Sequence, residues 1–227
     1  MRSILVFDLD DTLFPERDFV VSGFRAADLW LQRERSRTGF FGEALRLFEA
    51  GARGHIFDEA LQKIGADPDP VLIQRLVQVY RAHKPRLALY PDARQAIDHF
   101  RGHKKLGLIT DGYAVPQRNK VEALGIGSAF DIVVYSEELG RNHWKPSPAP
   151  YQKVMETLGC GGSDCVYVGD NPVKDFIAAR NLGWMTIRVR RNDGQHSQVE
   201  TGKDFDADWT VGSLGELVKL PGVGVDE

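Results

Sequence analysis

The sequence predicts an α/β protein, in which a parallel β-sheet has helices on both faces and a helical segment is inserted after the first strand. Three observations lead to this prediction. Short apolar runs alternate with segments of helical periodicity through most of the chain. The first apolar run is separated from the second by residues 14–90, which show helical periodicity alone. Polar residues suited to chemistry stand where several of the apolar runs end.

The expected strands are short runs rich in branched apolar residues. The first, residues 4–9, is interrupted only by Asp8, and such continuous runs suit a strand buried on both faces. Further strands are expected at residues 106–110, 131–136, 165–169, 184–189 and 209–211. Helices are expected between them at residues 96–100, 119–124, 151–158 and 175–181, and a polar loop at residues 192–203. This alternation indicates βαβ units with right-handed crossovers.

The inserted segment is expected to form a helical domain of its own. Val20, Phe24, Ala27 and Leu31 share one helical face, and glycines and prolines divide the whole segment into four expected helices. We therefore expect a helical domain at residues 14–90 and a core domain at residues 1–13 and 91–227. An insertion of this length within a sheet is uncommon unless it serves a function.

Composition and charge exclude several classes of protein. The chain has 227 residues, of which 42% are hydrophobic, as in an ordinary globular protein. Its 29 basic and 32 acidic residues give a net charge of −3, so nucleic acid is not an expected partner. No apolar stretch approaches the roughly 20 residues of a membrane span. Two cysteines, Cys160 and Cys165, are too few for a disulfide framework, and we expect a cytoplasmic, reduced protein.

Polar side chains follow the ends of separate predicted strands. In open parallel sheets, ligands bind in the crevice outside the carboxyl ends of the strands, so these side chains are expected to meet there. They are Asp8 and Asp10 at the first strand, Thr110 at the second, Lys145 beyond the third, and Asp170 with Asp175 after the fourth.

The acidic members of this group predict a metal site. A single Asp after a strand is usually a helix cap or a turn residue. Asp8, Asp10 and Asp170 brought together would repel one another and would be costly to bury without a cation. Oxygen ligands of this kind favour Mg²⁺ over zinc. We therefore expect Mg²⁺ as the cofactor.

Four motifs carry a resemblance to a known family. The segments DLDDT, LITDG, WKPSP and GDNPVKD stand in this order, each after a predicted strand. They resemble the motifs of the haloacid dehalogenase-like (HAD) hydrolase superfamily, in its phosphatase branch. The resemblance covers nearly the whole chain, and it implies a Rossmann-like core with a C1-type helical cap directly after the first motif.

The resemblance also implies roles for single residues. Asp8 corresponds to the nucleophile that forms an aspartyl-phosphate, and Asp10 to the general acid and base. Asp10, two residues on, is expected on the same side of the strand as Asp8. Thr110 would hold a phosphoryl oxygen, and Lys145 would neutralise charge on Asp8 and on the transferred group.

The resemblance assigns the metal contacts as well, and the substrate contacts are separate expectations. Mg²⁺ would be held by Asp8, the backbone carbonyl of Asp10, and Asp170, with Asp175 binding the metal or its water from behind. The expected substrate contacts are Asp111, Gly112, Arg17 and His143. Arg25 and His55 of the helical domain are further candidates for contacts to an anion or a hydroxyl group.

The second aspartate of the first motif selects among the chemistries of the family. Dehalogenases and phosphonate hydrolases of this superfamily lack the residue that corresponds to Asp10, so its presence favours phosphate esters. We expect a phosphomonoester hydrolase that acts on a small phosphorylated metabolite, such as a sugar phosphate or a nucleotide. A phosphomutase and a non-catalytic binding protein of the same fold remain alternatives, and the oligomeric state is open.

The loop before Lys145 departs from the family pattern. The residues between Gly140 and Lys145 make it longer than is usual there. The loop either projects His143 or Trp144 towards the leaving group or forms a surface loop with Trp144 packed on the cap.

Overall fold

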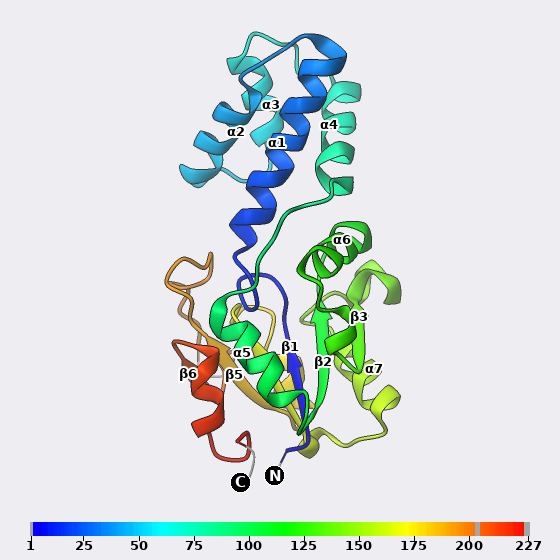
Figure 1. Ribbon diagram of the computed structural model, residues 1–227, viewed down its shortest axis with the longest axis vertical. Helices are drawn as coiled ribbons and strands as arrows, with labels where there is room; N and C mark the ends of the chain where they lie inside the picture. The colour runs from blue at the N-terminus through cyan, green and yellow to red at the C-terminus, as the bar shows by residue number, and fades with distance from the viewer. Residues whose placement is uncertain (1, 203–204, 225–227) are drawn as a thin grey trace. The chain divides into compact units, whose positions relative to one another are not determined.

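The computed structural model describes residues 2–202 and 205–224 (Figure 1). Lys203, the last residue of the expected polar loop, therefore lies outside the described residues. The chain divides into two compact units. The first, here called the core unit, comprises Met1–Glu16 and Ala88–Glu227, and the second, the helical unit, comprises Arg17–Leu87. The expected insertion, residues 14–90, extends three residues beyond the helical unit at each end.

The core unit contains a six-stranded sheet in which every neighbouring pair of strands is parallel. The strand order is β3-β2-β1-β4-β5-β6 (Figure 1). The strands are β1 (Ile4–Phe7), β2 (Lys105–Thr110), β3 (Ile132–Tyr135), β4 (Cys165–Gly169), β5 (Met185–Val189) and β6 (Trp209–Val211). The predicted α/β fold with a parallel sheet is confirmed.

Strand β1 lies inside the sheet and is shorter than expected. It pairs with β2 on one side and β4 on the other, and pairing ends at Phe7, opposite Leu108 and Val168. The expected strand at residues 4–9 was thus two residues too long. Leu9 is fully buried, but it belongs to the loop that follows. An apolar run indicates which residues are buried, not which are paired in the sheet. Here the buried residues extend beyond the end of the strand.

Helices cover both faces of the sheet. The core helices are α5 (Pro91–Phe100), α6 (Ala114–Leu124), α7 (Ala149–Leu158) and α8 (Ile177–Asn181). Tyr151 and Val154 of α7 pack with Ile4 and Val6, which point to one face of β1. The alternate residue Leu5 is also fully buried, so the opposite face is covered too. The fold therefore leaves only the ends of the strands for a site.

All four core helices start at residues other than those expected, with α6 beginning five residues early and α7 two residues early. The starts of α5 and α8 have clear local reasons. Helix α5 begins at Pro91, earlier than expected, because proline fits the first helical position, where no backbone N–H donor is needed. Helix α8 begins at Ile177, two residues after the expected start at Asp175. Asp175 instead closes a turn, in which its backbone N–H donates to the carbonyl of Asn171 at 3.0 Å. This turn positions the Asp175 side chain.

The helical unit is organised around aromatic side chains. Its helices are α1 (Glu16–Arg35), α2 (Phe40–Glu49), α3 (Ile56–Lys63) and α4 (Pro70–Ala82). The ring of Phe24 lies 5.9 Å from that of Phe57 and 5.7 Å from that of Tyr80. Within the described residues, no helix has the length and apolar character needed to cross a membrane.

Candidate active site

The expected site residues of the core unit lie at the carboxyl ends of β1, β2 and β4. Asp8 follows β1, Thr110 ends β2 and Asp170 follows β4. A cavity of about 100 Å³ opens at this edge of the sheet. Its acidic lining residues are Asp8, Asp10, Asp11, Glu16, Asp111 and Asp170. Asn171, Lys174 and His196 complete the lining.

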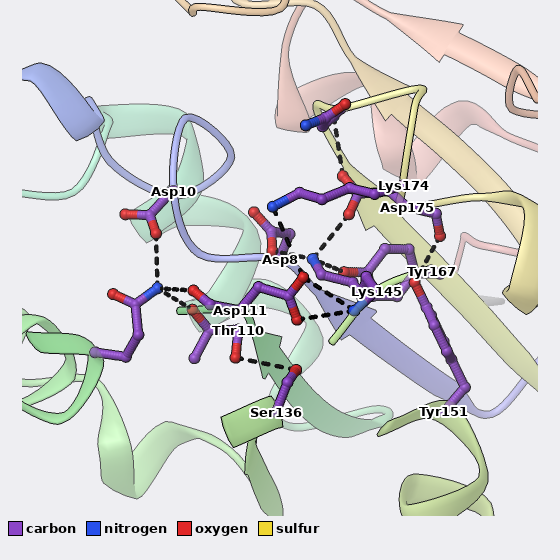
Figure 2. Close-up of polar contacts among 12 residues, drawn as sticks. Asp8, Asp10, Thr110, Asp111, Ser136, Lys145, Tyr151, Tyr167, Lys174 and Asp175 are labelled. Atoms are coloured by element: carbon purple, nitrogen blue, oxygen red, sulfur yellow. Dashed lines mark hydrogen bonds and ion pairs between the residues drawn. The ribbon is translucent and has the colours of Figure 1, made fainter. Parts of the chain in front are cut away.

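Lys145 is held among acidic and phenolic oxygens (Figure 2). Its Nζ donates to Asp8 Oδ1 at 2.5 Å, to Asp175 Oδ1 at 2.8 Å and to the Tyr167 hydroxyl at 2.9 Å. These contacts use the full donor capacity of an ammonium group. Burial by itself would lower the pKa of Lys145, but the carboxylates of Asp175 and Asp8 raise it well above its ordinary value. Lys145 is therefore a fixed positive charge beside Asp8.

Asp8 is a buried carboxyl group with too little positive charge around it. Burial raises its pKa to about 7, the Lys145 ammonium opposes that rise, and the neighbouring Asp175 adds to it. The charged form of Asp8 is the form that can attack or bind a cation. Additional positive charge in the cavity would favour that form.

The carboxylates of Asp8, Asp170 and Asp175 form a cluster that fits a hard divalent cation. One oxygen from each lies within 4.8 Å of the other two. Asp170 Oδ2 is buried and has no hydrogen-bond partner among the described residues. Burial raises the pKa of Asp170 well above its ordinary value, and Asp175 and Asp8 add to the rise. A buried, unpartnered carboxylate oxygen beside another carboxylate is costly unless a cation binds it.

Asp175 is the member of this cluster whose two carboxylate oxygens both accept hydrogen bonds from the protein. Its Oδ1 accepts from Lys145, and its Oδ2 accepts from the backbone N–H of Asn171 at 2.9 Å. Both oxygens are thus already in use, which suits the indirect role expected for Asp175. The same contacts orient Lys145 towards Asp8.

Asp10 lies apart from the cluster, and this corrects the expected alternation along the strand. Because β1 ends at Phe7, Asp10 belongs to the following loop, where it forms an isolated bridge with Phe14. Its Oδ1 accepts from Lys120 Nζ at 2.6 Å and its Oδ2 from Gln117 Nε2 at 2.8 Å. Asp10 nevertheless lines the same cavity as Asp8.

Of the three expected residues of the second motif, Asp111 lines the cavity, whereas Thr110 and Gly112 are not among its lining residues. Thr110 Oγ1 accepts from Gln117 Nε2 at 2.7 Å. The Asp111 carboxylate lines the cavity and accepts from the backbone N–H of Lys145 at 3.1 Å, so it anchors the third motif to the second. Gly112 has a φ of 120°, and a Cβ there would lie 3.4 Å from Gln117 Nε2. Glycine therefore lets the loop pass close to that side chain.

Other expected substrate contacts do not line the cavity. His143 is exposed on a short 3₁₀ turn, and Trp144 packs edge-on against Tyr113 at 5.9 Å between ring centroids. The longer loop therefore does not bring His143 to the cavity in this structure. Arg17 belongs to the helical unit, where its guanidinium pairs with Glu49.

The remaining candidates of the helical unit have partners within that unit. Arg25 lies over the ring of Phe41 at 4.3 Å. His55 is exposed, with Nδ1 at 3.9 Å from the Asp58 carboxylate. These contacts assign neither residue to a substrate.

Several side chains at the site were not among the expected site residues. Gln117 and Lys120 are both buried on α6, three residues apart. Two polar residues on the buried side of a helix were the sequence signal that could have identified them. Lys174 stands inside the fourth motif and approaches Asp111 Oδ2 at 3.9 Å. His196 comes from the polar loop and contacts Asn171 Nδ2 at 3.0 Å through Nε2.

The His196 loop is held by an arginine inside the sheet. Arg188 of β5 is fully buried, and its Nη2 donates to the carbonyl oxygens of His196 at 2.7 Å and Val199 at 2.8 Å. Asp11 joins the same loop to the site, because its Oδ2 accepts from the backbone N–H of Gln195 at 2.9 Å. A loop that is expected only to be polar is therefore fixed against the cavity.

Comparison with known proteins places the chain among hydrolases. Residues 3–183 match the family model described as haloacid dehalogenase-like hydrolase. A glyceraldehyde 3-phosphate phosphatase of Methanopyrus kandleri is 34% identical over 230 residues, with 97% of each chain covered. A phosphoserine phosphatase of Thermus thermophilus is 31% identical over 180 residues, covering 77% of this chain and 67% of the relative.

Solved structures agree on the fold. A HAD-superfamily hydrolase of Geobacter sulfurreducens has a TM-score of 0.70 at 20% identity, with 97% of each chain covered. A 2-haloacid dehalogenase of Pseudomonas syringae has a TM-score of 0.67 at 24% identity and covers 96% of this chain and 97% of its own. The matched segment, the full-length relatives and the architecture lead to one conclusion. The chain belongs to the haloacid dehalogenase-like hydrolase family, as its four motifs predicted.

Proposed function

We propose that this protein is a Mg²⁺-dependent phosphomonoesterase that hydrolyses a small phosphorylated metabolite through a phosphorylated Asp8. The observation that carries the proposal is the cavity shared by Asp8 and Asp10, with Lys145 fixed at 2.5 Å from Asp8. The expected reaction class is confirmed by relatives named glyceraldehyde 3-phosphate phosphatase and phosphoserine phosphatase. The substrate itself is not assigned by these names.

The first half of the reaction uses Asp8 as the nucleophile. Lys145 engages Oδ1 of Asp8, so the other oxygen attacks phosphorus. A bond forms between Asp8 and phosphorus while the ester bond breaks, and the leaving alkoxide takes a proton from Asp10. Lys145 balances the charge that accumulates on Asp8 and on the transferred group.

The second half returns the enzyme to its starting state. Asp10, now a carboxylate, takes a proton from water as the water oxygen attacks phosphorus. The bond between phosphorus and Asp8 breaks, and inorganic phosphate leaves. Gln117 donates to Thr110 Oγ1, so the Thr110 hydroxyl can give its own hydrogen to a phosphoryl oxygen in both halves.

Asp8, Asp170 and the Asp10 carbonyl would hold Mg²⁺, with Asp175 behind them. The donor set supports this, because all these ligands are hard oxygens and Asp170 Oδ2 has no hydrogen-bond partner in the part of the chain that the structure describes. When bound, the metal supplies positive charge that lets a phosphate dianion approach an acidic cavity. Lys174, which lines the cavity, adds an ammonium group of the chain itself.

The helical insertion would act as the cap that selects the substrate. Residues 14–90 supply this cap in the proposal, and Arg17 remains a predicted substrate contact, as does His143 from the core unit. A reducing, cytoplasmic setting also stays a prediction from Cys160 and Cys165, whose thiols are free. The nature of the leaving group is for experiment to decide.

A screen of phosphorylated metabolites tests the proposal. Purified protein is incubated with Mg²⁺ and with glyceraldehyde 3-phosphate, phosphoserine, sugar phosphates or nucleotides, and released phosphate is measured. We expect release from at least one small phosphomonoester, and loss of release in excess chelator that added Mg²⁺ restores. The Asp98→Asn variant, which alters an exposed carboxylate on α5, serves as the matched control.

Other results would select the alternatives. Transfer of the phosphoryl group to another position of the same substrate would identify a phosphomutase. Ligand binding with no turnover of any ester would identify a binding protein. Full activity in excess chelator would contradict the assignment of the metal.

A further inference from the structure

Helix α6 presents two buried polar side chains to Asp10. Lys120 Nζ donates to Asp10 Oδ1 at 2.6 Å, and Gln117 Nε2 donates to Asp10 Oδ2 at 2.8 Å. Lys120 is 4% exposed and Gln117 is 2% exposed, whereas the Asp10 side chain is 21% exposed. The two donor side chains are thus enclosed in the protein. The Asp10 carboxylate lies between them and the cavity and is partly exposed to solvent.

The Gln117 amide has one orientation that its surroundings permit. Its nitrogen lies 2.8 Å from Asp10 Oδ2, 2.7 Å from Thr110 Oγ1 and 2.5 Å from the Asp111 carbonyl oxygen. The carboxylate and the carbonyl accept hydrogen bonds and cannot donate them. The nitrogen end of the amide must therefore face these groups, and its two hydrogens are shared among the three acceptors. Figure 2 shows Asp10 and Thr110 joined by dashed lines to this one nitrogen.

Lys120 is fixed by packing as well as by charge. Its Nζ lies 5.8 Å from the centroid of the Phe14 ring, close enough for a cation–π contact. Phe14 in turn forms the isolated bridge with Asp10. The loop that carries Asp10 and the helix that carries Lys120 are therefore joined twice. Burying an ammonium group is costly, and a hydrophobic residue of similar volume is often equally stable there.

We propose that Lys120 and Gln117 are positioning residues that fix the Asp10 carboxylate for proton transfer in the hydrolysis reaction. This inference rests on the proposed function, in which Asp10 exchanges the proton. Each Asp10 oxygen receives one buried donor, and each keeps a second lone pair that can face the cavity. The carboxylate plane is thereby set. Gln117 also ties Asp10 to Thr110, so the proton donor and the proposed phosphoryl contact share one support.

Lys120→Met is the most direct test, because methionine keeps the length of the side chain and removes the donor. For an alkyl phosphate, whose leaving group needs a proton, we expect kcat to fall about 10- to 100-fold, the size of effect that misplacement of a reacting group produces. The KM should change little, since Lys120 does not line the cavity. Nitrophenyl phosphate should still form the aspartyl-phosphate at nearly the wild-type rate.

The two ester classes separate positioning from general damage. With nitrophenyl phosphate, rapid mixing of Lys120→Met should give a burst of nitrophenolate followed by a slow steady rate, because attack of water still needs Asp10. Gln117→Leu should show the same difference between esters, added to a loss common to both, because Thr110 also loses its donor. Lys120→Arg, which retains a cationic donor, should recover part of the alkyl phosphatase activity.

Two controls remove charge without touching Asp10. Arg118→Gln alters the same helix at an exposed position, where Arg118 Nε contacts Glu138 at 3.0 Å. Lys104→Met removes another buried lysine, whose Nζ donates to the Arg2 carbonyl at 2.5 Å. Neither should change the ratio of the rates for the two esters. Circular dichroism and thermal unfolding identify any variant that fails to fold. If Lys120→Met or Gln117→Leu fails to fold, the rates for the two esters are compared in Lys120→Arg and Gln117→Asn.

A double-mutant cycle decides whether Lys120 acts through Asp10. In an Asp10→Asn background, Lys120→Met should have almost no further effect on either step. Equal slowing of both esters, or losses that add in the double variant, would overturn the inference. Failure of the proposed function is a separate result, since wild type would then release no phosphate, or Asp10→Asn would lose both ester classes equally.

Discussion

The interiors of the two units are built from different chemistry. In the helical unit, Phe24 is 2% exposed and Leu76 is fully buried, and the interior consists of aromatic and aliphatic side chains. In the core unit, the side chains of Lys145 and Asp175 are also fully buried, and Asp8 is 6% exposed. The interior of the helical unit is apolar, whereas the interior of the core unit combines apolar side chains with buried charges.

This difference separates stability from reactivity. Apolar burial lowers the free energy of the folded state with little demand on orientation. Buried charges carry a desolvation cost that their mutual attraction offsets only in favourable geometry. The core unit retains Asp8 with a pKa raised to about 7 by burial. Burying this carboxylate makes the folded protein less stable. In return, the carboxylate is available to bind a cation or to react with a substrate.

The largest effect is expected from Asp8→Asn. The amide has the same shape but is a poor nucleophile, so phosphate release should fall by roughly 10⁴-fold or more. The melting temperature should stay equal or rise, because a neutral side chain is easier to bury and Lys145 keeps Asp175 and Tyr167 as partners. Phosphate release and thermal unfolding measure the two quantities. More than a few per cent of wild-type activity in this variant would contradict the role of Asp8 as the nucleophile. Asp8 would then serve only as a metal ligand.

Phe24→Ala should produce the opposite pattern. The Phe24 ring contacts the rings of Phe48, Phe57 and Tyr80, so its removal leaves a cavity in the helical unit. We expect a loss of about 3–5 kcal/mol in the free energy of unfolding of that unit. Urea denaturation followed by circular dichroism measures this loss, and Val71→Ala, at an exposed position of α4, is the control. A loss below about 1 kcal/mol would show that the interior of the unit is loosely packed.

Asp92→Asn tests whether burying a carboxylate is unfavourable throughout the core unit or only at the candidate site. Asp92 Oδ2 accepts from Arg191 Nη1 at 2.7 Å and from the backbone N–H of Leu214 at 2.8 Å. Burial alone would raise the pKa of Asp92, but these hydrogen bonds outweigh it and hold the pKa below its ordinary value of 3.8. Asp92 is thus a satisfied carboxylate, unlike Asp8.

The effect of Asp92→Asn should be small and should depend on pH. Because the folded-state pKa is lowered, the stabilisation is complete above the unfolded pKa and is lost as pH falls through the folded pKa. We expect about 1–2 kcal/mol of lost stability at neutral pH, and a smaller difference from wild type below pH 3.8. Denaturation curves at several pH values measure it. A difference that stays constant down to pH 2 would mean that the charge of Asp92 contributes nothing.

Local patterns were sufficient for the sheet. The apolar run at Cys165–Gly169 predicted β4 with its observed bounds, because that strand is buried throughout. The end of β1 was missed because Leu9 stays buried after pairing has stopped at Phe7. Hydrophobicity reports burial and does not report which backbone groups are paired.

The site was predictable only in its motif residues. Asp8, Thr110 and Asp170 follow strands, and the parallel sheet brings strand ends together whatever the intervening sequence. Gln117 and Lys120 could not be assigned, because their meaning depends on the rotation of α6 against the loop of Asp10. Roles for the cap residues stay predictions, since their contacts lie within the helical unit.

The position of β1 in the sheet has a consequence for the making of the protein. Ile4 pairs with Lys105 on one side and Cys165 on the other, so each partner is distant along the chain. Contacts of such long sequence separation are slow to form, whereas those within Arg17–Leu87 join residues near one another. On the ribosome, the helical unit can assemble before the second neighbour of β1, the strand that Asp8 follows, has been synthesised. Strand β1 is thus synthesised before both of its partners in the sheet and is enclosed only after them.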